Sequence, residues 1–193
     1  MGQLDSPLTD LGILQAEAIA NRLKLHSISS LYSSDLGRAI QTADYISTAV
    51  ECEVRPHEGL RERHMGIFQG LTRSEAQDNY PTEWADYGSM GFEYIIPEGE
   101  SASQRLDRSI RTMTAIAEEN PDSDVVVVTH GGFLMGFFEY VLGLSPGNGW
   151  RFKRHNASYS LFDYSQNRWS LVTWNDVSHL GDKSSLDDPT TQQ

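Results

Sequence analysis

A histidine and an arginine stand at points where strand-like segments give way to helix-like ones. His130 follows four consecutive valines and precedes Gly131 and Gly132, whereas Arg38 lies just after the strand-like run 31–33. The N–H groups at a helix start attract anions, and a cation placed there opposes the helix dipole, so its presence calls for an explanation. Because sites in α/β sheets form where strands end, the two basic side chains could hold one phosphate group.

Glu62 is the candidate acid, because a carboxyl group in a loop beside an anion site can protonate the leaving oxygen of a phosphate ester. The spacing alone leaves plainer interpretations open. Arg38 could be a surface charge, and His130 could be a buried structural histidine. Glu62 could be a solvated carboxylate paired with Arg61 or Arg63. Three further histidines are expected to be structural: His64, His155 and His179.

Composition excludes several classes of function. The 193 residues contain 15 Lys and Arg and 27 Asp and Glu, and the resulting net charge of −12 repels nucleic acid and anionic membranes. We therefore expect neither as a partner. A single cysteine, Cys52, excludes an internal disulfide and a multi-cysteine metal site. The first residues do not resemble a signal peptide and no run of about 18 apolar residues occurs, so we expect a cytoplasmic protein. The sequence does not indicate an oligomeric state.

The first half of the chain predicts helices on both sides of a short strand. A helix is expected after Thr9, where apolar residues recur at the helical period, and a strand and loop over 28–34. Asp35 is expected to cap the next helix. Residues 56–99 mix charge, aromatics, glycine and proline, which predicts a long excursion with brief helical patches around 73–79.

The second half alternates strands and helices. Ser101 is expected to begin a helix, and the valines at 125–128 predict a strand that is buried on both faces. The apolar segment 133–142 predicts a buried helix, and 158–164 with 169–174 predict a hairpin. This alternation favours the α/β class.

Four segments resemble, in order and context, those of the histidine phosphatase superfamily, the phosphoglycerate mutase-like group. They occupy residues 33–43, 60–66, 97–101 and 128–132. Shorter similarities occur at 2–9, 156–158, 174–176 and 179–180. The resemblance therefore covers the chain from residue 1 to about residue 180.

The resemblance implies a fold and a domain plan. We expect a three-layer α/β/α sandwich with a mostly parallel central sheet. One domain would span 1–180, with a cap insertion at about 69–99. A flexible polar tail would follow at 181–193. The aromatic side chains of 69–94 either close the pocket or form a small separate core.

The resemblance also implies a mechanism in which one histidine attacks phosphorus to give a phosphohistidine. By motif, Arg38 binds the phosphate, Glu62 donates a proton to the leaving group and His130 stabilises the transferring group. Gly131 adds a backbone donor, and Gly2 is also expected to bind the phosphate. The ligand would be a small-molecule phosphate ester, and the chemistry needs no metal or other cofactor.

In the family, an Arg-His-Gly motif that carries the nucleophilic histidine precedes the segment resembling residues 2–9, and these 193 residues do not contain it. Three explanations are open. The chain could be a truncated form that starts at an internal methionine, which we favour because Arg38, Glu62 and His130 are intact. It could be a non-catalytic module that binds phosphate esters. Alternatively, His130 or His64 could serve as the nucleophile.

The length of the excursion bears on the reaction. Phosphoglycerate mutases generally carry a longer excursion between the proton-donor motif and the segment resembling 97–101. The compact excursion here favours hydrolysis of phosphate monoesters, with 2,3-bisphosphoglycerate-dependent mutase chemistry as the alternative.

Overall fold

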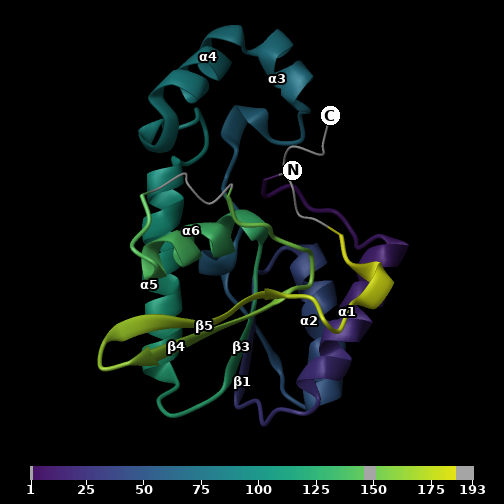
Figure 1. Ribbon diagram of the computed structural model, residues 1–193. Helices are drawn as coiled ribbons and strands as arrows, with labels where there is room; N and C mark the ends of the chain where they lie inside the picture. Colours follow the sequence, from purple (N-terminus) through teal and green to yellow (C-terminus); the bar gives the residue numbers. More distant parts are fainter. Residues whose placement is uncertain (1, 146–150, 186–193) are drawn as a thin grey trace.

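A computed structural model describes residues 2–145 and 151–185 and shows a parallel sheet between two helical layers (Figure 1). The strands lie in the order β2-β1-β3, and both pairs are parallel. Their bounds are β1 (Ser30–Ser33), β2 (Val54–Pro56) and β3 (Val125–Val128). Around them lie α1 (Asp10–Leu23), α2 (Gly37–Val50), α5 (Ala102–Glu119) and α6 (Gly131–Val141). The predicted α/β fold with a parallel central sheet is confirmed.

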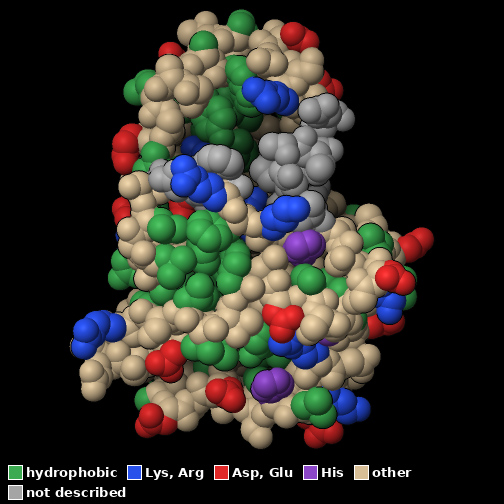
Figure 2. All heavy atoms as spheres, viewed as in Figure 1, with side chains coloured by type: hydrophobic (Ala, Val, Ile, Leu, Met, Phe, Trp, Pro, Cys, Tyr) green, Lys and Arg blue, Asp and Glu red, His purple; other side chains and the backbone are tan. Residues whose placement is uncertain are grey.

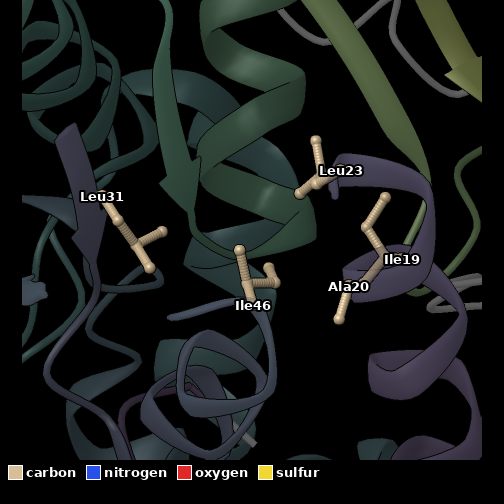
Figure 3. Close-up of a cluster of buried hydrophobic side chains, with 5 residues drawn as sticks. All are labelled: Ile19, Ala20, Leu23, Leu31 and Ile46. Carbon is tan, nitrogen blue, oxygen red and sulfur yellow. The ribbon is translucent and has the colours of Figure 1, made fainter. Parts of the chain in front are cut away.

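The alternation of side chains along the strands builds one core on each face of the sheet. Leu31 of β1 packs against α1 and α2, in the cluster drawn in Figure 3. Its neighbour Tyr32 packs on the opposite face, against α5 and α6. The first cluster contains Ile19, Ala20, Leu23, Leu31 and Ile46, and the second contains Tyr32, Leu60, Ile116 and Phe133. These two cores make the architecture a three-layer sandwich.

Two of the three predicted helix caps are confirmed. The Thr9 hydroxyl accepts the Gly12 N–H, and Ser101 forms a reciprocal capping box with Gln104. The prediction for α2 is wrong, because its N-cap is Leu36 and its first N–H, that of Gly37, donates to Asp5 at 2.8 Å. Asp35 forms an ion pair with Arg61 instead. The cap is thus supplied by a carboxylate distant in sequence, which local spacing does not reveal.

The C-terminal strands form the predicted hairpin. β4 (Tyr159–Ser165) and β5 (Arg168–Asp176) are antiparallel, and the turn residues Gln166 and Asn167 both have positive φ, 51° and 57°. Two successive positive φ values are typical of a type I′ turn, which suits the twist of a hairpin. Within the described residues, this hairpin pairs with no strand of the parallel sheet.

The burial of β3 differs from the prediction. We expected the four valines of 125–128 to be buried on both faces, but all four are only partly buried. A cavity of about 1820 Å³ lies between β3 and the hairpin and is lined by the valines and by residues 159–165. In the part of the chain that the structure describes, β3 pairs only with β1, so its other edge faces this cavity.

The excursion contains more helix than predicted. The helix α3 (Arg73–Asn79) coincides with the predicted patch, but α4 (Pro81–Met90) was not predicted. Both lie at the top of Figure 1, beyond the body of the molecule. We call residues 69–99 the cap. Short 3₁₀ helices complete the described elements: η1 (Glu58–Leu60), η2 (Gly66–Phe68), η3 (Gly91–Glu93) and η5 (Gly181–Lys183).

The C-terminal segment also departs from its prediction. Residues 181–185, expected to begin a flexible tail, contain η5 and are hydrogen-bonded to α1, where the Gln15 amide donates to Lys183 O at 2.6 Å. Residues 186–193, the remainder of the predicted tail, lie outside the described residues. No helix in the described ranges is long and apolar enough to cross a membrane.

Candidate active site

His130 lies where β3 passes into α6, at the N-cap position of that helix, as predicted. Its Nε2 is 2.7 Å from the Ser34 hydroxyl at the end of β1. Burial lowers the pKa of His130 to about 4, an effect that Glu62 opposes and Arg38 reinforces. At neutral pH the imidazole is therefore uncharged and can share a hydrogen bond with Ser34.

Arg38 lies in the first turn of α2, also as predicted, and lines the same cavity as His130. Its guanidinium donates to two backbone carbonyls, those of Leu4 and Gly2, each at 2.9 Å. Gly2 has a φ of 58° and lines the cavity as well. In this structure Gly2 orients Arg38 through its carbonyl, and the binding of phosphate by Gly2 stays a prediction.

Glu62 places its carboxylate at the start of α6. One oxygen accepts the Gly132 N–H at 2.7 Å, and the other accepts the Arg63 N–H at 2.7 Å. Gly131 is the first residue of α6, between His130 and Gly132. The structure therefore brings Arg38, Glu62, His130, Gly131 and Gly2 to the wall of one cavity.

Arg108 of α5 fixes the loop that carries Glu62. Its guanidinium donates to Gly59 O at 2.9 Å, to Arg61 O at 2.8 Å and to Glu62 O at 3.3 Å. It also forms an ion pair with Glu100 at 2.5 Å. The sequence analysis missed Arg108. Its spacing of four from the buried Thr112 places it on the inner face of α5.

The side chains of Arg61 and Arg63 do not neutralise Glu62. Arg61 forms a bidentate pair with Asp35, which lowers the pKa of that carboxyl. The Arg63 Nε donates to Glu100 O at 3.1 Å. The plainer interpretation of Glu62 as a solvated partner of these arginines is therefore wrong.

The other histidines have structural contacts. His64 Nδ1 accepts the Gly66 N–H at 3.1 Å, and the His155 ring contacts the Asn175 side chain at 2.9 Å. His179 lies 2.8 Å from Ala157 O. Across the described ranges, no group of three or more His, Cys, Asp or Glu side chains is arranged to hold a metal.

Comparison with known proteins identifies the family. The model of the histidine phosphatase superfamily (branch 1) matches residues 1–177. The chain belongs to this superfamily. The resemblance seen in the sequence is thereby confirmed, and the site described above lies in a histidine phosphatase domain.

Two curated histidine phosphatase relatives carry different names. A metal-independent phosphoserine phosphatase of Arabidopsis thaliana is 37% identical over 182 residues, covering 93% of this chain and 75% of that protein. A probable phosphoglycerate mutase, GpmB, of Proteus mirabilis is 35% identical over 192 residues, covering 94% and 86%. The homologues thus include both phosphatases and mutase-like proteins.

A solved structure of a phosphatase is also similar to this chain. The mycobacterial glucosyl-3-phosphoglycerate phosphatase in complex with inorganic phosphate superimposes with a TM-score of 0.74 at 31% identity, covering 93% of this chain and 92% of that one. The relatives together support a phosphatase-type enzyme.

Proposed function

We propose that this histidine phosphatase hydrolyses small-molecule phosphate monoesters at the site of Arg38, Glu62 and His130. One observation carries the proposal. The Glu62 carboxylate lies on the Gly132 N–H at the start of α6, immediately after His130. A proton donor and an anion-attracting helix start therefore share one end of the cavity, and Arg38 lines the same space.

Each residue has a role that suits its surroundings. Arg38 and the Gly131 N–H would hold the phosphate oxygens, and the uncharged His130 would donate a hydrogen bond to the transferring group. Glu62 would protonate the ester oxygen as the P–O bond breaks, and would later take a proton from the attacking water. A small ester as substrate is consistent with the net charge of −12, which disfavours nucleic acid and anionic membranes.

We further propose that the nucleophile is a histidine on an additional strand encoded upstream of these residues, and that it forms a phosphohistidine. The support is the edge of β3 that faces the cavity, because a strand placed there would end beside His130. Covalent catalysis by positioning groups alone would fail, since the nucleophile forms the intermediate.

Two alternatives remain as outcomes of the test. A non-catalytic module would bind phosphate esters without turnover. A mutase would move the phosphoryl group, and one relative bears that name. The compact cap of this chain is our reason for preferring hydrolysis.

The test is hydrolysis of p-nitrophenyl phosphate by the 193-residue chain and by a form extended with the upstream coding sequence. Each form is assayed beside His130→Ala and beside His26→Ala, a control at an exposed histidine. We expect turnover only in the extended form, and a loss of at least about a hundredfold in His130→Ala.

Other outcomes overturn specific parts of the proposal. Binding of phosphate esters without turnover in either form would establish the non-catalytic module. Turnover by the 193-residue chain that depends on His130 would mean a replacement nucleophile. Interconversion of 2- and 3-phosphoglycerate faster than phosphate release would establish the mutase.

A further inference from the structure

Ser34 follows β1 directly and contacts the ring of His130. The residue is completely buried, with an exposed fraction of 0%. Its backbone N–H donates to Val128 O at 2.9 Å, which extends the pairing of β1 with β3 by one residue. Ser34 and His130 therefore lie just beyond the carboxyl ends of two paired strands, so the sheet itself sets the distance between them.

The hydrogen bonds of the Ser34 hydroxyl decide which of the two partners is the donor. A serine hydroxyl has one proton to donate and two lone pairs that accept. The oxygen accepts the Leu36 N–H at 3.4 Å, and its other contact is His130 Nε2 at 2.7 Å. If Nε2 were the donor, the Ser34 proton would have no acceptor in the described part of the chain. A buried donor without an acceptor is costly, so Ser34 donates and Nε2 accepts.

This direction sets the position of the proton on the imidazole. An uncharged ring carries one proton, so an Nε2 that accepts a hydrogen bond leaves that proton on Nδ1. Among the described residues, His130 Nδ1 has no hydrogen-bond partner, and the atom is not closed off from solvent. His130 lines the cavity together with Arg38 and Gly131. The Nδ1–H is therefore a donor that a ligand in the cavity can reach.

The surroundings of the ring are rich in positive charge. Burial is the main cause of the low pKa of His130, and Glu62 opposes it. The charges of Arg38 and Arg108 act in the same direction as burial. Figure 2 shows basic side chains gathered around the hollow between the cap and the rest of the molecule. A phosphate group is attracted to such a place, and a neutral Nδ1–H can donate to it without a charge of its own.

We infer that Ser34 is a positioning residue, which donates its proton to His130 Nε2 and thereby fixes the tautomer whose Nδ1–H binds the transferring phosphoryl group. This inference rests on the proposed function, because it takes the phosphoryl group as the ligand of His130. Without the Ser34 hydroxyl, the proton could occupy either ring nitrogen, and the ring would lose its anchor at the end of β1. A donor stabilises the transferring group only when its proton and its orientation are set in advance.

NMR of the 193-residue chain with 15N-labelled histidine tests the tautomer directly. Correlations between the ring nitrogens and the carbon-bound ring protons distinguish a protonated from an unprotonated nitrogen. At pH 7 we expect the His130 proton on Nδ1 in the unmodified chain and a mixture of tautomers in Ser34→Ala. Ser34→Thr keeps a hydroxyl and should restore the Nδ1–H form.

Kinetics of the extended form test the consequence for the reaction. Ser34→Ala should lower kcat for p-nitrophenyl phosphate at least about tenfold and change KM less, because the lost contact orients a group that acts in the transition state. Ser30→Ala is the matched control. Ser30 is also buried and lies at the other end of β1, where its hydroxyl donates to Asn120 Oδ1 at 2.7 Å. This variant should keep both the Nδ1–H tautomer and kcat.

The outcomes separate this inference from the proposed function. An Nε2–H tautomer in the unmodified chain would overturn the inference, and that result does not depend on how any variant folds. Full kcat in Ser34→Ala, or an equal loss in Ser30→Ala, would overturn the positioning role. An inactive extended form with the proton on Nδ1 would instead contradict the proposed function and leave the tautomer of His130 as inferred.

Discussion

His130 links the site to the stability of the fold through its protonation. Its pKa falls from the ordinary 6.5 to about 4 because the ring is buried. Between these values the unfolded chain binds a proton that the folded chain does not. The contribution of the uncharged His130 to the free energy of unfolding is therefore complete above about pH 6.5 and is lost as the pH falls toward 4.

We predict that the free energy of unfolding falls by about 3 kcal/mol more between pH 7 and pH 4 in the unmodified chain than in His130→Gln. Urea titrations at several pH values measure this difference, and the remaining histidines contribute equally to both proteins. Parallel pH profiles for the two proteins would contradict the buried, uncharged state of His130.

The predictability of the site differs from one residue to the next. Arg38, Glu62 and His130 were predicted because each lies in a short local motif at a strand end or loop. Arg108 was not, because its hydrogen bonds to the loop carbonyls of Gly59, Arg61 and Glu62 span 46 to 49 positions in the chain. Such contacts depend on how α5 packs against the loop and α6, and local spacing does not determine that packing.

At the scale of the element, the start of α6 has room for Glu62 only because Gly132 lacks a side chain. A Cβ added there would overlap the Glu62 carboxylate. We predict that Gly132→Ala reduces phosphate ester hydrolysis at least about tenfold, because the proposed proton donor is displaced. The free energy of unfolding should change by no more than about 1 kcal/mol, since alanine favours the helix. Kinetics and urea unfolding of the active form measure the two effects.

Gly88 in α4 provides the matched control. A Cβ added at Gly88 meets nothing within 4 Å. Gly88→Ala should therefore keep the rate, and alanine should raise the free energy of unfolding slightly. A Gly132→Ala protein with the full rate would show that Glu62 need not occupy the helix start.

Element prediction succeeded where a local signal marks an end. Thr9 and Ser101 begin α1 and α5, and the Gln166–Asn167 turn forms the hairpin. It failed for α4, which has no side-chain cap and no buried residue and begins directly after α3 at Pro81. Its inward-facing aromatic residues, Trp84 and Tyr87, pack against Phe68 outside the helix, and so short an apolar face does not mark a helix in the sequence.

On the scale of the whole molecule, the open edge of β3 has a measurable consequence. N–H groups of β3 that do not point toward β1 face the cavity instead. We predict that hydrogen exchange at residues 125–128 is at least about tenfold slower in the extended form than in the 193-residue chain. Mass spectrometry of peptides across β3 measures this, and β1, which pairs on both edges, is the internal reference. Equal exchange at 125–128 in the two forms would contradict the added strand.

The run of valines shows what a sequence pattern conveys about the whole fold. It correctly predicted a strand with helices on both faces, since the valines pack alternately into the two cores. It did not predict their partial exposure. Burial depends on which strands lie beside β3, and neighbouring strands are set by topology rather than by the strand's own residues.

The aromatic cluster of the cap bears on how such a protein can diversify. Phe68 packs edge-to-face against Tyr80, Trp84 and Tyr87, in a core separate from the two that flank the sheet. A substitution within this third core would change the cap without disturbing the two cores that flank the sheet. Sequence changes can therefore accumulate in the cap while the two cores of the sandwich are inherited unchanged.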